Sequence, residues 1–362
     1  MSQMSIQSDR GDLDHDAIDQ DYARRAGEYR NLAFGLSFHG QQIHFAEILR
    51  SEDGFSVRKM GTIQTTMKFG TGIEGVERNV QGLFAYLKGC LEDNGIRAKR
   101  MNISLNTNLV TLHKVLVESE RSESDFQDYI KWEFRQQVTD DFDQYILNTV
   151  PLEKTSPAPM DPMLMVGIRR RYADSLRSVL DKSKIQFSNM DVDILCTHAT
   201  YEVNYDISYH GMTVLAECKT GSVTLLLCKD YDVQHVYQFT VSPKSTPQKI
   251  GELINAHIPN MMQAYHATAG NTNSVVGRLI LCHDLAQEVL PYIEADFNPS
   301  VIEPFRKIKL PAEFRPHEKN EDSESASADA DEKDNKSQVV IAPPDYAVYA
   351  EAVGAAIKLL MD

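Results

Sequence analysis

The sequence predicts an α/β protein made of two similar lobes with a cleft between them. Strand-like and helix-like apolar patterns alternate along most of the chain, and a three-stranded meander followed by a helix occurs twice, first after residue 30 and again near residue 190. A repeat of this size indicates an internal duplication, and helices that flank mixed sheets in two lobes leave a cleft between them. The 362 residues, of which 42% are hydrophobic, suffice for two compact units.

Two acidic stretches lie outside this pattern. Residues 1–30 contain seven acidic and four basic residues, and residues 317–338 contain eight acidic and three basic residues. Such segments cannot bury enough apolar surface to fold, so we expect a disordered N-terminal tail and a disordered insert. Together they carry eight of the fifteen net negative charges, which leaves the folded body only mildly acidic.

The first lobe is expected over residues 31–189. A turn that starts at Gly40 divides the extended stretch 31–50 into two strands, and a second turn at Gly54 precedes a third strand. Apolar residues three and four positions apart predict the helix that follows, and Gly95 ends it. The predicted elements are strands within 31–50, at 55–57 and at 100–105, and a helix over 75–94.

A small subdomain is expected to be inserted into the first lobe over about residues 101–168. Ser124 has the residue type of a helix N-cap, and the apolar pattern after it continues to Gln137. The predicted elements are an apolar run at 111–117, a helix that ends at residue 137, strands at 145–150 and 163–168, and a helix over 171–182.

The second lobe is expected over residues 190–316 together with 339–362. It repeats the meander of the first lobe, with a turn that ends at Gly221 between its first two strands. The predicted elements are helices at 196–203, 247–264, 286–293 and 345–360, and strands at 212–217, 222–228, 233–239 and 278–282.

Composition excludes several classes of protein. The net charge of −15 and the pI near 5.2 disfavour nucleic acid as a partner, because binding a phosphate backbone needs a basic face. The sequence contains no apolar run near the ~20 residues that span a bilayer, and the acidic N-terminus resembles no export signal. We therefore expect a cytoplasmic protein. Its five cysteines, without a C-x-x-C pair, are expected to be reduced core residues.

Two short runs contain groups that bind metals in other proteins. They are Cys196-Thr197-His198 and Cys282-His283-Asp284. Neither has the spacing of a zinc motif, and adjacent residues on a strand point to opposite faces, so that Cys282 and His283 should not reach one ion. The sequence therefore predicts no metal site.

Several segments resemble one family more closely than the two-lobe plan alone requires. The order of these segments is similar to that of the PilM-type type IV pilus assembly proteins, a branch of the actin/Hsp70/sugar-kinase superfamily. The resemblance implies an actin-like (ribonuclease H-like) two-lobe fold with a small inserted subdomain, and it covers most of residues 31–312 and 340–361. The segments that carry it are 101–105, 115–117, 126–133, 141–145, 164–168, 172–180, 190–193 and 346–356.

An actin-like fold binds ATP with two hairpins, each of which needs glycine for close approach to phosphate and an aspartate that organises Mg²⁺. The family pattern for the first hairpin is Asp-x-Gly, and this chain has Ser37 and His39 at those two places. The second hairpin has Glu217 and Lys219 instead. The residues that we align with the family's nucleotide loops are Gly35, Ser37, His39, Gly40, Glu217, Lys219, Thr220, Gly221, Ser222, His283 and Asp284.

The third nucleotide loop of the family is a turn rich in glycine, whereas this chain has His283 and Asp284 there. Departures at three separate loops predict a degenerate nucleotide site with no catalytic residue and no cofactor. The alternative is that Gly40 and Gly221 allow ATP and Mg²⁺ to bind in a shifted register, with Lys219 on a phosphate and Glu217 near the metal.

The resemblance implies a function as well as a fold. PilM-like proteins are cytosolic scaffolds, and they hold the N-terminal tail of a single-span inner-membrane partner of the PilN type in a groove between subdomains. We therefore expect a non-catalytic scaffold of a type IV pilus or type II secretion-like assembly, peripheral to the inner membrane at most, as a monomer or a homo-oligomer. The alternative is a member of the same family that binds ATP, with or without hydrolysis. A sugar-kinase-like enzyme is a weaker alternative, because the sequence offers no candidate base.

Overall fold

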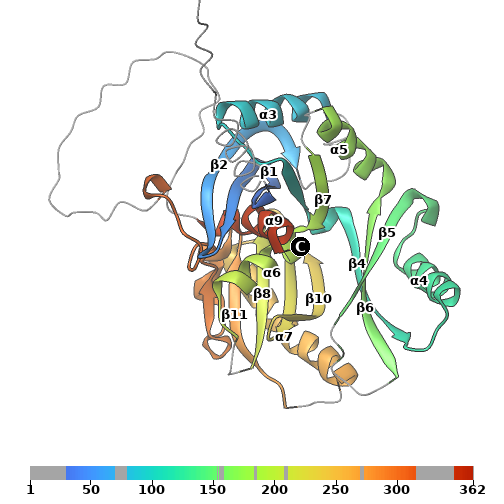
Figure 1. Ribbon diagram of the computed structural model, residues 1–362. Coiled ribbons are helices and arrows are strands. Elements are labelled where there is room, and N and C mark those ends of the chain that lie inside the picture. The colour runs from blue at the N-terminus through green and yellow to red at the C-terminus, as the bar shows by residue number, and fades with distance from the viewer. Residues whose placement is uncertain are drawn as a thin grey trace, which may run out of the picture.

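The computed structural model describes residues 30–69, 80–152, 154, 159–182, 186–207, 211–269, 273–314 and 346–361. The predicted acidic insert lies outside these residues, as does the predicted tail except for Arg30. Within them, the strands form sheets of four, five and three strands. Figure 1 shows the first two sheets one above the other, with the third at the side.

The sheet of the first lobe has the order β2-β1-β3-β7. Its strands are β1 (Leu32–Ser51), β2 (Gly54–Phe69), β3 (Arg100–Leu105) and β7 (Gln186–Val192). Although β1 is 20 residues long and would span about 65 Å if extended, the Arg50 N–H donates to the Asn31 carbonyl oxygen at 2.8 Å. β1 is therefore a hairpin, and its turn contains Gly40 at a φ of 54°, which confirms the predicted pair of strands.

The second lobe repeats this sheet. Its order is β10-β9-β8-β11-β12, in which β8, β9 and β10 pair antiparallel and β11 pairs parallel to both β8 and β12. When the two limbs of β1 are counted separately, the first lobe has the same order and the same directions. The predicted duplication is therefore present. The strands are β8 (Met212–Lys219), β9 (Ser222–Lys229), β10 (Asp232–Thr240), β11 (Val276–Cys282) and β12 (Pro299–Val301).

Equivalent helices follow the meanders of the two lobes. In the first lobe α3 (Val80–Asp93) precedes β3, and in the second lobe α7 (Pro247–Ala269) precedes β11. Gly95, at a φ of 59°, ends α3 as predicted, while residues 75–79 of the predicted helix lie outside the described residues. The short helix α8 (Ala286–Val289) follows β11.

Two helices lie between the sheets, namely α6 (Asp193–Asn204) and α9 (Ala350–Met361). Figure 1 shows α9 at the centre of the molecule, next to α6. Residues 339–362 were expected in the second lobe, but α9 packs on β1 and β3 of the first lobe as well as on α6. The assignment of this helix needs correction, because its contacts are with strands more than 200 residues away and leave no local signal in the sequence.

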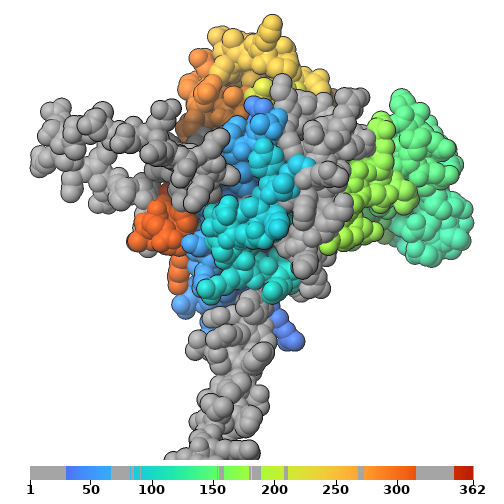
Figure 2. Space-filling view, turned by 90° about the horizontal axis from the view of Figure 1, so that it is seen from above, coloured from blue at the N-terminus to red at the C-terminus, as the bar shows by residue number. Residues whose placement is uncertain are grey.

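The inserted subdomain is a three-stranded antiparallel sheet of order β4-β6-β5, with one helix on one face. Phe134 of the helix packs against Val115 and Met165 of the sheet, and the subdomain protrudes from the body (Figure 2). Its elements are β4 (Val110–Glu118), α4 (Glu123–Gln137), β5 (Tyr145–Pro151) and β6 (Met160–Arg169), after which α5 (Arg170–Lys182) returns to the first lobe.

Two predicted boundaries of the subdomain need correction. The insertion does not begin at residue 101, because β3 pairs with β1 in the main sheet; it begins after β3. The N-cap of α4 is Ser122 rather than Ser124, and the Ser122 side chain accepts a hydrogen bond from the Asp125 N–H at 3.2 Å. Both serines have a side chain that can cap a helix. Ser122 is the cap because the helix begins directly after it, at Glu123.

The cysteines follow the sequence expectation as far as the described residues allow. Cys196, Cys218, Cys228 and Cys282 are free and buried. No helix in the described part of the chain is both long enough and apolar enough to cross a membrane.

Candidate functional site

The three loops that sequence aligns with a nucleotide site meet between the two lobes. His39 lies in the β1 hairpin, Lys219 ends β8, and His283 and Asp284 follow β11. His39 Nε2 lies 3.1 Å from Asp284 Oδ2, and the rings of His39 and His283 meet edge to face with their centroids 4.2 Å apart. The structure therefore brings these loops together as the alignment predicts.

The ammonium group of Lys219 lies among three carboxylates. Its Nζ is 3.2 Å from Glu217 Oε2 and 2.8 Å from Glu351 Oε1, and it also donates to Asp193 Oδ2. These four residues are each at most 3% exposed. Asp193 begins α6 and Glu351 lies in the first turn of α9, so both helices that lie between the sheets contribute to the cluster.

The strand β8 positions two members of this cluster. Glu217 and Lys219 are two residues apart and therefore point to the same face of the sheet, whereas Cys218 between them belongs to the apolar core on the other face. A hydroxyl group and a backbone N–H group hold two of the carboxylates in place. Thr197 Oγ1 donates to Glu217 Oε1 at 2.5 Å, and the Thr107 N–H donates to Asp193 Oδ2 at 2.9 Å.

The charges of this cluster are unequal, with one ammonium group and three carboxyl groups. Burial alone would lower the pKa of Lys219, but the charges of Asp193, Glu217 and Glu351 raise it well above its ordinary value. Burial and the charge of Asp193 raise the pKa of Glu217 well above its ordinary value, although Lys219 opposes this shift. Lys219 is therefore charged at neutral pH. Glu217 takes up a proton more readily in this cluster than a glutamate does in water.

A second cluster contains His39, His283 and Asp284, whose ligating atoms all lie within 4.8 Å of one another. His283 Nδ1 lies 2.7 Å from Asp284 Oδ1. Burial alone would raise the pKa of Asp284, but hydrogen bonds and charge from His283 and His39 bring it well below its ordinary value. Burial, together with the charge of His283, lowers the pKa of His39.

This second cluster bears on the predicted absence of a metal site. As expected, Cys282 packs in an apolar core cluster of the second lobe. The sequence argument considered only neighbours in the chain, however, and His39 comes from the other lobe. A sequence offers no local signal for such a long-range pair.

The remaining predicted site residues have structural roles. A Cβ on Gly35 would lie 1.8 Å from the Ala352 carbonyl oxygen, so Gly35 allows α9 to approach β1. Thr220 and Gly221, the latter at a φ of 95°, form the turn between β8 and β9. Ser222 Oγ accepts a hydrogen bond from Asn108 Nδ2 at 3.2 Å, and Ser37 is fully buried in β1.

Sequence reasoning missed Asp193 and Glu351. Each is an acidic residue in the first turn of a helix, a place where the helix dipole favours negative charge. An acidic residue near the start of a predicted helix was the available signal. This signal does not identify the basic residue with which each acid pairs, because Lys219 is 26 residues from Asp193 and more than a hundred from Glu351 in the sequence.

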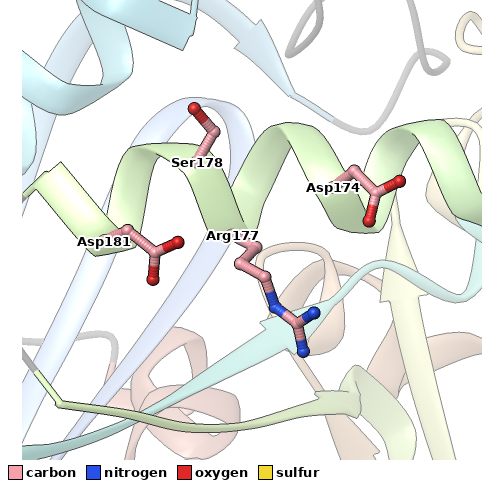
Figure 3. A pocket seen from close by; sticks show the side chains of 4 residues that line it. All are labelled: Asp174, Arg177, Ser178 and Asp181. Carbon is pink, nitrogen blue, oxygen red and sulfur yellow. The ribbon is translucent and has the colours of Figure 1, made fainter.

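A groove with a volume of about 740 Å³ lies between the inserted subdomain and helices α5, α6 and α9. Its apolar lining comes mainly from the face of the β5–β6 sheet opposite to α4, and from the helices facing it. Arg177 lines the groove from α5. Figure 3 shows a second, neighbouring pocket on α5, in which Arg177 extends on the side opposite to Ser178, between Asp174 and Asp181. The lining includes Ile146, Val150, Leu164, Val166, Ile168, Met190, Leu195, Lys358 and Met361.

The repeated sheet order and the central helices α6 and α9 define an actin-like two-lobe protein. Its fold is similar to that of a solved "PilM-PilN type IV pilus biogenesis complex", with 11% identity, a TM-score of 0.65, and coverage of 91% of this chain and 98% of that chain. The chain is therefore PilM-like in fold, as the resemblance predicts. No family model and no curated protein matches the sequence.

Two further solved structures are similar to this chain at lower TM-scores. The cytoplasmic domain of EpsL, an inner-membrane component of the type II secretion system of Vibrio cholerae, is 9% identical, with a TM-score of 0.41 and coverage of 78% of this chain and 86% of that chain. A protein from Bacteroides thetaiotaomicron with an actin-like ATPase fold is 11% identical, with a TM-score of 0.42 and coverage of 75% and 95%.

Proposed function

We propose that this chain is a non-catalytic, actin-like scaffold of a type IV pilus or type II secretion-like assembly, located at the cytoplasmic face of the inner membrane. Its groove binds the N-terminal cytosolic tail of a single-span, PilN-like membrane protein. The observation that carries the proposal is the apolar groove beside the inserted subdomain. The similarity of fold to a protein solved together with PilN supports it.

The groove suits an extended peptide. Ile146 and Val150 of β5 are 38% and 42% exposed, which leaves apolar area for a partner to cover. β5 is the last strand in the order β4-β6-β5, so its outer backbone groups can pair with an added strand, as in other cases of strand addition. Side chains at every second position of such a peptide would then enter the groove.

The groove also has charged residues that can set the direction of the peptide. Lys358 forms an ion pair with Asp191, and Arg177 and Glu202 lie along the same groove. A peptide with apolar residues at alternate positions and charged residues between them matches this pattern. Apolar contacts would supply affinity, and the charged groups would supply register.

A substitution in the groove tests this proposal. Val150→Asp is expected to weaken binding of the tail by about 30-fold, because burying a carboxylate without a partner costs about 2 kcal/mol or more. The probe is a fluorescently labelled peptide with the N-terminal cytosolic residues of a PilN-like, single-span protein encoded in the same genome. Fluorescence anisotropy gives the dissociation constants of the wild type and the variant.

The matched control is Val275→Asp. Val275 is 61% exposed and lies outside the groove, so this variant should bind the peptide as the wild type does. Equal losses in the two variants, or binding of the wild type no tighter than that of a scrambled peptide, would contradict the groove proposal. Circular dichroism confirms that both variants are folded.

The non-catalytic part of the proposal predicts that Mg-ATP does not bind more tightly than millimolar. Lys219 stands where the family has the phosphate-binding glycine, and its ammonium group is held by three buried carboxylates. Isothermal titration calorimetry on the full chain measures this. Tighter binding that is lost in a folded Glu217→Ala variant would favour the alternative, an ATP-binding member of the same family.

A further inference from the structure

We propose that His39, His283 and Asp284 form a binding site for a divalent transition-metal ion of the zinc class, and that the ion links the two lobes. His39 belongs to the β1 hairpin of the first lobe, whereas His283 and Asp284 follow β11 of the second lobe. One ion with ligands from both lobes would oppose their separation. This site is distinct from the peptide groove, and the proposal does not depend on the groove having a partner.

The geometry of the three side chains fits such an ion. Zinc binds imidazole nitrogen and carboxylate oxygen at about 2.0–2.2 Å, which places neighbouring ligands of a tetrahedral site about 3.3–3.5 Å apart. Asp284 Oδ2 is 3.1 Å from His39 Nε2, and Asp284 Oδ1 is 2.7 Å from His283 Nδ1. All three ligating atoms lie within 4.8 Å of one another. Only small movements of the side chains would admit the ion.

The kind of ligand determines the class of metal. Two imidazoles and one carboxylate favour zinc and its neighbours over magnesium or calcium, which prefer ligand sets made of oxygen alone. Three protein ligands leave a fourth position for water. The side chains of His39 and Asp284 are 14% and 31% exposed, so the fourth position can face solvent, and the ion has a route of entry.

The backbone holds His283 in this orientation. His283 is buried and has a φ of 76°, a conformation that residues with a Cβ rarely adopt. Its second ring nitrogen, Nε2, lies 3.3 Å from Glu351 Oε1. A carboxylate beside the far nitrogen of a metal-binding histidine is the usual outer partner of such a ligand.

The surrounding charge favours a cation. Asp284, Asp193, Glu217 and Glu351 are carboxyl groups in this region, and Lys219 is the cation that pairs with three of them. Asp284 is paired with the two imidazoles instead. A divalent ion at this place would supply positive charge beside the Asp284 carboxylate and between the two imidazoles.

The test uses the tag-free full chain after treatment with a chelator. Co²⁺ is the first probe, because tetrahedral cobalt with nitrogen and oxygen ligands absorbs visible light, and Zn²⁺ is then titrated by calorimetry. We expect one equivalent to bind. The variants His39→Gln and Asp284→Asn should each lower the affinity by about 100-fold or more, since even an outer partner contributes about 10–100-fold. Zn²⁺ should also raise the thermal unfolding midpoint of the wild type but not of these variants.

His257→Gln is the matched control, because His257 stacks on Phe239 away from the cluster and its loss should change neither the affinity nor the zinc-dependent midpoint. The midpoints without metal show whether each variant is folded. The proposal is overturned if the wild type binds neither ion at micromolar concentration. It is also overturned if folded His39→Gln and Asp284→Asn variants bind as tightly as the wild type.

Discussion

Replacing Lys219 with methionine is expected to lower the free energy of unfolding at pH 7 by about 3–5 kcal/mol, because the change leaves buried carboxylates without their cation. The ammonium group contacts Asp193, Glu217 and Glu351, and all of these residues are buried. Methionine has a similar volume and needs no partner, so the loss would come from charge rather than from a cavity. Urea denaturation followed by circular dichroism measures it.

The dependence of this loss on pH distinguishes charge from packing. In the wild type the folded state raises the pKa of Lys219 above its ordinary value of about 10.5. The stability that the charged Lys219 contributes is therefore complete at every pH below about 10.5. It is lost only when pH rises through the raised pKa of the folded state. The pKa of Glu217 is also raised, so the folded state favours its proton, and the resulting stability falls as pH rises. The charge of Lys219 opposes the rise in the pKa of Glu217. In the variant that pKa therefore rises further, and stability falls more steeply as pH rises. The deficit of the variant should therefore shrink as pH falls from 8 to 5.

Lys307→Met provides the control for Lys219→Met. Lys307 pairs with Asp206 at 2.7 Å, but the two side chains are 44% and 81% exposed, and such surface pairs contribute about 0–1 kcal/mol. Similar losses in the two variants, or a deficit of Lys219→Met that does not change with pH, would show that the buried charges do not stabilise the fold as argued.

Local chemistry explains why much of the fold could be predicted. Gly40 and Gly221 have the positive φ values that tight turns require, so both hairpins could be read from the sequence. The same turns repeat in both halves, and this repetition indicated the duplication. Gly95 could be recognised as a helix end for the same reason.

Contacts between distant segments could not be predicted in this way. Asp193 and Glu351, which contact Lys219, come from helices α6 and α9. His39, which contacts His283, comes from the first lobe. The resemblance to the family marked three loops in the sequence, and the structure places these loops side by side. The resemblance could not indicate that two clusters would form there, one around an ammonium group and one around a carboxylate between two imidazoles.

The contact between α6 and α9 gives the other prediction with a large effect. Gly354→Ala is expected to lower the free energy of unfolding by about 3 kcal/mol or more. Its added Cβ would lie 1.7 Å from the Cys196 carbonyl oxygen and 2.9 Å from Thr200 Oγ1. Overpacking a well-packed interior usually costs about 1–3 kcal/mol, and here the obstacle is backbone, which cannot turn aside as a side chain can. The two helices would have to separate.

Gly89→Ala is the matched control and should have the opposite sign. Gly89 lies in α3, where an added Cβ would meet only Asp93 Oδ2 at 3.8 Å, so alanine should stabilise the protein by about 0.5–1 kcal/mol through its higher helix propensity. Alanine at position 354 would bring the same gain in helix propensity. The net loss of stability in Gly354→Ala is therefore due to the clash between the added Cβ and α6. Because α9 packs on the first-lobe sheet and α6 packs in the second-lobe core, separating these helices loosens the joint between the lobes. If Gly354→Ala proved as stable as Gly89→Ala, the close approach of α6 and α9 could not be what joins them.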